Sequence, residues 1–150
     1  MNPARLLASF AGVGLVPVAP GTVGSLAALL PGLALLWVSP AALTAGVVVV
    51  VAIGLWAIHT AGAGDDPGWV VIDEVAGQWI ALLALPQPSI LGALAAFAAF
   101  RLFDVTKPGP VGWAERLPGA VGVMADDVLA GGLAALVVWG VRWAVPGLLG

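Results

Sequence analysis

Carboxylates are the side chains of this sequence best placed to do chemistry, and they fall into a few short stretches. Seven of the eight acids are Asp65, Asp66, Asp73, Glu74, Asp104, Asp126 and Asp127. Acids that converge repel one another and become partly protonated unless a positive charge lies between them. The chain has no cysteine and one histidine, so ligands would be oxygen atoms, which favour Mg²⁺ or Mn²⁺ over zinc.

A simpler interpretation is that these acids cap helices or lie in solvated loops. It suits Asp66 and one of the pair Asp126-Asp127, which we expect at helix N-termini, where negative charge is stabilised. It does not suit Asp73 and Glu74, which lie within an apolar helical segment. An ionised carboxylate there costs several kcal/mol unless it is paired or bound to a cation, so these two acids predict a functional cluster.

Basic residues accompany Asp104 at helical spacing. Arg101 precedes Asp104 by three residues, and Lys107 follows by three. In a functional interpretation Arg101 and Lys107 hold phosphate oxygens, while Asp104 orients a metal or Lys107. In the alternative they form an internal ion pair and a helix C-terminal cap. The spacing leaves both open.

A further motif, APGTVGS at 19–25, opens an apolar segment. Free N–H groups at a helix start, with the Thr22 and Ser25 hydroxyls, can bind an anion. For the motif alone an ordinary capped turn is the favoured explanation, and the nucleotide-binding loop pattern is lacking. Since His59 is the only histidine, a two-histidine phosphatase mechanism is excluded, and no Ser-His-acid triad stands out.

The elements that must position these residues are apolar helices. The chain is 61% hydrophobic and 9% charged, whereas soluble domains carry about 25% charged residues, which predicts one all-α integral membrane domain over 1–150. An apolar helix needs roughly 20 residues to cross a bilayer. Cap-then-proline signals and Gly/Pro breaks predict a polytopic bundle of about five membrane helices after a short interfacial N-terminal helix at 3–14. The five ranges are 22–38, 40–61, 67–85, 89–105 and 126–145, with a polar loop before the last.

Counting crossings brings the polar segments to one membrane face. With the N-terminus inside, 19–22, 65–74, 101–107 and 126–127 all reach the inner face. Arg5, Arg101, Lys107 and Arg116 lie near that face and Arg142 near the other, a positive-inside pattern that predicts a cytoplasmic site. The third and fourth helices either span fully or form a shorter hairpin. In both cases the two ends of the pair return to the same membrane face, so the assignment of faces is unchanged.

Four segments in order resemble the bacterial phosphatidylglycerophosphatase A family. They are GLVPVAPGTVGSL (14–26), DDPGWVVIDEVAGQW (65–79), FRLFDVTKPGPV (100–111) and ERLPGAVGVMADDVLAG (115–131). One departure is Gly119-Ala120, where the family pattern has a Gly-Gly pair. The resemblance implies a six-helix, multi-pass protein of the bacterial inner (cytoplasmic) membrane. It also implies a Mg²⁺-dependent phosphatase that converts the phospholipid phosphatidylglycerophosphate to phosphatidylglycerol, with no nucleic-acid partner. No oligomeric state follows.

The resemblance and the acid pattern together give a mechanistic hypothesis of direct hydrolysis. The expected metal ligands are drawn from Asp65, Asp73, Glu74, Asp126 and Asp127. The expected catalytic residues are Asp73, Glu74, Asp104 and Asp127. The expected phosphate-binding residues are Thr22, Ser25, Arg101 and Lys107. A covalent aspartyl-phosphate on Asp104 or Asp127 is the rival route.

A second class of function is a small cation-coupled transporter or channel component. It predicts acids distributed across the membrane depth, whereas these acids lie near one face, and the apolar helices show no polar pathway.

Overall fold

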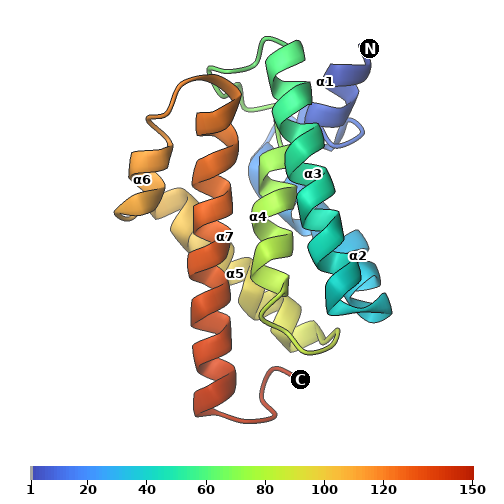
Figure 1. Ribbon diagram of the computed structural model, residues 1–150, viewed down its shortest axis with the longest axis vertical. Helices are drawn as coiled ribbons and strands as arrows, with labels where there is room; N and C mark the ends of the chain where they lie inside the picture. The colour runs from blue at the N-terminus through green and yellow to red at the C-terminus, as the bar shows by residue number, and fades with distance from the viewer. Residues whose placement is uncertain (1) are drawn as a thin grey trace.

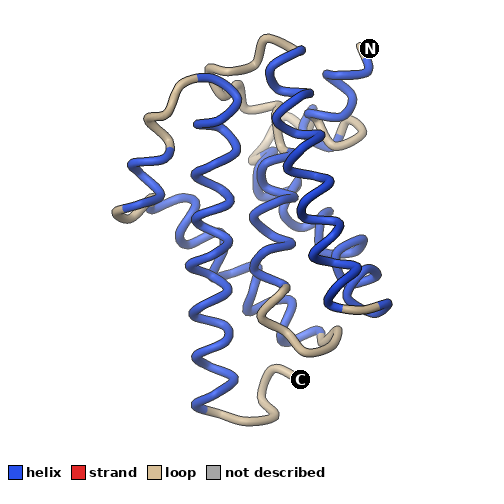
Figure 2. Tube along the Cα trace, viewed as in Figure 1, coloured by secondary structure: helices blue, strands red, loops and turns tan. Residues whose placement is uncertain are grey.

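The computed structural model describes residues 2–150, which form seven α-helices, one 3-10 helix and no strand (Figures 1 and 2). The predicted all-α class is confirmed. The elements are α1 (Pro3–Ala8), η1 (Val13–Leu15), α2 (Pro20–Val38), α3 (Pro40–Thr60), α4 (Ile72–Leu82), α5 (Ile90–Thr106), α6 (Pro110–Ala114) and α7 (Gly119–Ala144).

Three of these helices, α2, α3 and α7, are long and apolar enough to cross a membrane. Helix α4 has 11 residues, hence a length of about 16 Å, against a hydrocarbon core of about 30 Å. Helix α5, with 17 residues, is at the lower limit. Of the five membrane helices expected, three are therefore long enough to span, and α4 and α5 are shorter. Helix α4 packs among α2, α3 and α7, whereas α5 lies against α4 and α7 with an exposed apolar face.

The turn between α2 and α3 follows the sequence signal closely. The Ser39 side chain accepts a hydrogen bond from the Ala42 N–H (2.9 Å), and Pro40 occupies the first helical position. Proline has no N–H to leave unpaired there, so one short turn ends α2 and starts α3. The predicted boundary is confirmed.

The predicted helix at 67–85 starts later than expected and is shorter. Asp66 has a left-handed backbone (φ +50°), and the residue before the first turn of α4 is Val71, so Asp66 is not a helix cap. The Val71 N–H donates to the Ala8 carbonyl of α1 (2.9 Å), and the Arg5 guanidinium lies over the Trp69 ring at 4.8 Å. These contacts with α1 hold the preceding loop in a non-helical path.

The last helix, by contrast, starts earlier than predicted and is longer. Helix α7 begins at Gly119 after Pro118, so most of its first two turns occupy what the sequence predicted to be loop. Asp126 and Asp127 therefore lie inside α7, and the interpretation of either as an N-terminal cap is wrong. The predicted polar loop also contains the short helix α6.

Helix α4 lies at the centre of the bundle, in contact with α2, α3, α5 and α7 (Figure 1). Its Val75, Ala76 and Leu82 are fully buried, and the Trp79 indole N–H donates to the Ala28 carbonyl of α2 (2.8 Å). The α2–α3 and α4–α5 turns lie at one end of the bundle (Figure 1). The starts of α4 and α7 lie toward the other end, as the parity of the crossings predicts.

Candidate active site

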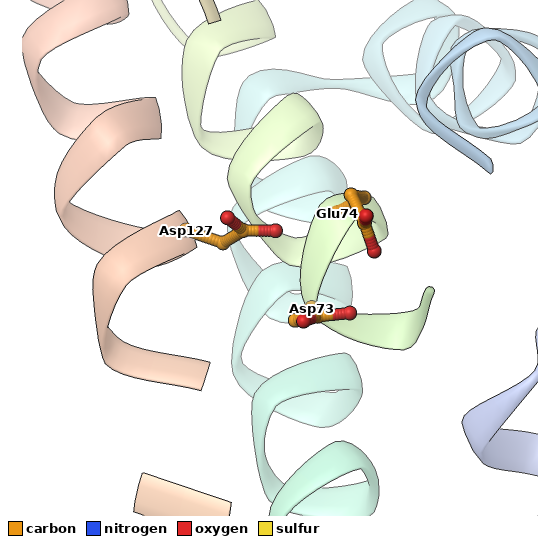
Figure 3. Close-up of side chains that lie close together, drawn as sticks. All are labelled: Asp73, Glu74 and Asp127. Atoms are coloured by element: carbon orange, nitrogen blue, oxygen red, sulfur yellow. The ribbon is translucent and has the colours of Figure 1, made fainter. Parts of the chain in front are cut away.

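Three carboxylates from two helices meet inside the bundle (Figure 3). Asp73 and Glu74 lie in the first turn of α4, and Asp127 reaches them from α7. One oxygen atom from each residue lies within 4.8 Å of the others. Asp73 is 5% exposed and Asp127 is 3% exposed, so water does little to screen the repulsion between them.

Each of these carboxylates has a buried oxygen without a hydrogen-bond partner in the described chain. The atoms are Asp73 Oδ1, Glu74 Oε2 and Asp127 Oδ2. Leaving a buried acceptor unsatisfied costs about 1–3 kcal/mol, and more when the acceptor is charged. A divalent cation would satisfy all three at once, and oxygen donors from two or three carboxylates suit Mg²⁺ or Mn²⁺. The donor set therefore fits such an ion.

Two glycines bring the acids of α4 and α7 together. A Cβ atom at Gly77 would lie 2.6 Å from the Asp127 carbonyl oxygen, and one at Gly131 would lie 2.9 Å from the Gly77 Cα. Only a residue without Cβ allows such a close backbone approach at both positions. Asp73 and Glu74 also gain from their place at the start of α4, where the helix dipole stabilises negative charge.

A network of ion pairs lies beside the three carboxylates. Arg101 pairs with Asp104, while the Lys107 Nζ lies 2.5 Å from Asp126 Oδ2, 3.6 Å from Asp104 Oδ1 and 3.8 Å from Glu115 Oε1. Burial alone would lower the pKa of Lys107, but the hydrogen bond and charge of Asp126, followed by the charge of Asp104, raise it above its ordinary value. Lys107 is therefore a permanent cation.

The start of α2 approaches both groups. A Cβ atom at Gly21 would collide with Glu74 Oε1 and lie 3.4 Å from Arg101 Nη1. Thr22 is half-buried beside it, in the helix turn whose N–H groups lack helical partners. Ser25 is fully buried and donates its hydroxyl proton to the Gly21 carbonyl (2.8 Å).

An acidic cavity of about 350 Å³ lies next to this network. Its lining comprises Gly64, Asp65, Asp66, Glu115, Leu117, Gly122, Val123 and Asp126. Partial burial, and then the charge of Asp126, raises the pKa of Asp66 above its ordinary value. Asp126 also contacts Lys107, so the cavity adjoins the ion-pair network.

The structure thus sorts the predicted site residues into groups. Asp73, Glu74 and Asp127 form the carboxylate cluster, while Arg101, Asp104, Lys107 and Asp126 form the ion-pair network. Thr22 lies at the start of α2, Asp65 is exposed in the acidic cavity, and the Ser25 proton is used within α2. Asp65 and Asp126 therefore lie outside the cluster of three.

Sequence reasoning missed Gln78, a fully buried residue whose amide has no hydrogen-bond partner among residues 2–150. A signal was present, because Gln78 follows Glu74 by four residues and is therefore on the same face of an apolar helix.

Comparison with known proteins identifies the family. The model of the family "Phosphatidylglycerophosphatase A" matches residues 6–142. The chain belongs to this family. The Escherichia coli strain K12 protein named "Phosphatidylglycerophosphatase A" is 39% identical over 143 residues, covering 92% of this chain and 83% of that protein. The Haemophilus influenzae protein of the same name is 40% identical over 148 residues, covering 95% of this chain and 91% of that protein.

A third relative carries a different name. The Bacteroides thetaiotaomicron protein named "Putative phosphatidylinositol-3-phosphatase" is 42% identical over 147 residues, covering 89% of this chain and 90% of that protein. No solved structure matches the chain.

Proposed function

We propose that this protein is a Mg²⁺-dependent phosphatase that hydrolyses phosphatidylglycerophosphate to phosphatidylglycerol and phosphate at the cytoplasmic face of the membrane. The observation that carries the proposal is the cluster of Asp73, Glu74 and Asp127, with an unsatisfied buried oxygen on each, beside Arg101 and Lys107. Membership of the phosphatidylglycerophosphatase A family supports the substrate.

Asp73, Glu74 and Asp127 would hold the metal ion. When bound, Mg²⁺ supplies Lewis-acid polarisation of a phosphoryl oxygen and lowers the pKa of a bound water. The three side chains contribute a fixed, water-poor set of oxygen atoms, because two of them are almost fully buried. Glu74 is half-buried and closest to α2, so it forms the side of the cluster that the substrate phosphate approaches.

Arg101, Lys107 and the start of α2 would bind the phosphate. Arg101 Nη1 and Glu74 Oε1 both lie beside Gly21, so the guanidinium can donate to a phosphoryl oxygen near the proposed metal ligands. The N–H groups of the first turn of α2 and the Thr22 hydroxyl provide further donors. Lys107, held charged by its acidic neighbours, stabilises negative charge that develops on the phosphoryl group.

Direct attack by water is the route that we favour. The Asp104 carboxylate is occupied by Arg101 and Lys107, and such pairing weakens it as a nucleophile. Asp127 remains the rival nucleophile for a covalent route. Rapid acid quench of the enzyme with ³²P-labelled substrate separates the routes, since an acid-labile phosphoprotein requires the covalent one and its absence during turnover supports direct hydrolysis.

The proposed function also includes an arrangement of the helices in the membrane. In our proposal α2, α3 and α7 cross the bilayer around α4, with the site in the cytoplasmic half. Helix α5 packs against α4 and α7 and leaves apolar residues such as Ile90 and Val105 exposed to lipid. Arg5 lies in α1, and Arg101 and Lys107 pair with Asp104 and Asp126 beside the site. Arg142, near the end of α7, donates to the Ala84 carbonyl close to the α4–α5 turn, and this distribution supports a cytoplasmic site. The substrate's acyl chains then stay in the bilayer while its phosphate enters the polar interior.

Phosphate release from detergent micelles tests the proposal. Purified protein should release phosphate from phosphatidylglycerophosphate with Mg²⁺ and not with EDTA, and Asp127→Asn should abolish the release. Parallel micelles of phosphatidylinositol 3-phosphate test the substrate that the Bacteroides relative's name suggests. Faster release from that lipid would replace the substrate, whereas no release from either by folded protein would favour a transport function.

A further inference from the structure

Gln78 is buried in the middle of α4 with no partner for its side chain. It is fully inaccessible to solvent, and neither Oε1 nor Nε2 makes a hydrogen bond in the described chain. A primary amide can accept and donate several hydrogen bonds, so burying it unpaired is costly. Such a residue is a poor structural choice, since a leucine or methionine would fill the same space at no such cost.

The unpaired atoms of Gln78 belong to a single group. Within residues 2–150, the buried side-chain oxygens and nitrogens without a partner are those of Asp73, Glu74, Gln78 and Asp127. The other buried polar side chains are satisfied; Ser25 donates to Gly21, and Asp126 accepts from Lys107. Among the described residues, the protein therefore satisfies its buried polar side chains except for the three carboxylates of the cluster and the Gln78 amide.

Helix geometry places Gln78 next to the carboxylate cluster. Gln78 follows Glu74 by four residues, which puts it on the same face of α4, about 6 Å farther along the helix axis. That direction leads away from the α1 end of the bundle and toward the α4–α5 turn (Figure 1). Gln78 therefore lies on the inner side of the cluster, whereas Arg101 and Gly21 lie next to Glu74.

We propose that Gln78 is the fourth residue of the ion site, with Oε1 as a neutral oxygen ligand that binds the cation directly or through one water molecule. This inference rests on the proposed metal-dependent function. Amide oxygens are ordinary ligands of hard cations. A neutral ligand completes the site without adding negative charge to three carboxylates that already repel one another.

The proposal predicts that removing the amide preserves or raises metal-free stability and weakens metal binding. Gln78→Met keeps the side-chain volume and removes the unpaired amide. The metal-free variant should therefore melt at the same or a higher temperature than the native protein. It should bind Mn²⁺ about 10–100-fold more weakly, as expected when a group around a metal is lost. A purely structural glutamine would lower the metal-free melting temperature and leave Mn²⁺ affinity unchanged.

Mn²⁺ titration of the purified protein in detergent tests this, with free Mn²⁺ measured by electron paramagnetic resonance and melting followed by tryptophan fluorescence. Gln78→Glu keeps an oxygen at the position and should bind Mn²⁺ at least as tightly as the native protein. Trp79→Phe is the matched control. It removes the adjacent, satisfied hydrogen bond to Ala28, so it should lower the melting temperature and leave Mn²⁺ affinity unchanged.

Several outcomes would overturn the role of Gln78. They are native Mn²⁺ affinity in Gln78→Met, a loss of metal-free stability in that variant like that of Trp79→Phe, or equally weak binding by Gln78→Glu and Gln78→Met. Failure of the native protein to bind Mn²⁺ would instead count against the metal-dependent function itself, so the two failures are distinguishable.

Discussion

At the scale of single residues, the site is built from polar atoms that the fold buries and does not pair. Asp73 and Asp127 come from different helices, and neither has a basic partner in the described chain, whereas Asp104 and Asp126 are both paired with Lys107. Acids with cationic partners stabilise the folded protein, and acids without them destabilise it until a cation binds. The two groups should therefore respond in opposite ways to substitution.

Asp127→Asn should lower Mg²⁺-dependent phosphate release by about 100-fold or more, because the proposed metal ligand loses its charge. The same variant should be at least as stable as the native protein in EDTA, because the repulsion with Asp73 and Glu74 is relieved. Phosphate release and melting temperature measured on one preparation check both. Asp65→Asn, at an exposed residue outside the cluster, is the control and should retain most activity.

Lys107→Met should destabilise the metal-free protein by about 1–3 kcal/mol, since it leaves Asp126 buried without its partner. The folded-state pKa of Lys107 is raised, so its contribution is complete below the ordinary lysine pKa of about 10.4 and disappears only above the raised value. The loss should accordingly be equal at pH 7 and pH 9, measured by chemical unfolding in detergent.

The double variant Lys107→Met/Asp126→Asn should recover most of that stability, since it removes both charges. A double variant as unstable as Lys107→Met alone would show that Lys107 stabilises the fold through other contacts.

The site was predictable from sequence where a residue conflicted with its surroundings. Asp73 and Glu74 stand out because ionised acids in an apolar helix need compensation. Asp65 was predicted as a metal ligand only because it is near them in the sequence. In the structure it is exposed and lines the acidic cavity. Gln78 was missed because an uncharged amide is compatible with a helix, and its lack of partners is visible only once neighbouring helices are placed.

At the scale of helices, the contact between α4 and α7 decides whether the carboxylates can meet. Gly77 and Gly131 let the two backbones touch, and a Cβ at Gly77 would also collide with the Phe100 ring of α5. In a membrane the hydrophobic effect does not drive helices together, because lipid is as apolar as the side chains. Small residues at a helix crossing stabilise the contact by allowing close van der Waals packing. The glycines therefore set the position of Asp127 relative to α4.

Gly131→Ala should push α7 away from α4, with a cost of about 1–3 kcal/mol in stability and a clear loss of Mn²⁺ affinity, because the ligands of the two helices separate. Gly132→Ala is the matched control, since a Cβ there meets nothing within 4 Å. It should leave stability and Mn²⁺ affinity at native values. Equal behaviour of the two variants would contradict the role of the close helix contact.

Helix boundaries were predictable where local chemistry fixes them. Ser39-Pro40 separates α2 from α3 through a side-chain cap and a proline, and both act within one turn. The start of α4 depends instead on the hydrogen bond from the Val71 N–H to the Ala8 carbonyl, a contact between residues far apart in the sequence that residue spacing does not encode. The start of α7 at Gly119 is likewise set by packing, because Gly64 lies against Gly119 and Gly54 against Met124.

At the scale of the whole molecule, polarity is concentrated toward one end of an otherwise apolar bundle. Exposed tryptophans occur near several helix ends, as expected at membrane interfaces, with Trp37 and Trp143 about four-fifths exposed. The turns at 39–40 and 83–89 lie at the end opposite the starts of α4 and α7 (Figure 1). Because α2, α3 and α7 are long enough to span, these two ends should face opposite sides of the membrane.

Cysteine labelling tests that orientation without a background, because the native chain has no cysteine. Thr60→Cys places a thiol on an exposed residue at the site end, and Gln87→Cys places one in the exposed α4–α5 turn. A membrane-impermeant maleimide should label Gln87→Cys in intact spheroplasts and Thr60→Cys only in inverted vesicles, since the arginine and lysine distribution favours a cytoplasmic site. The reverse pattern would place phosphate release on the outer face, and labelling of both from one side would mean that the helices do not cross.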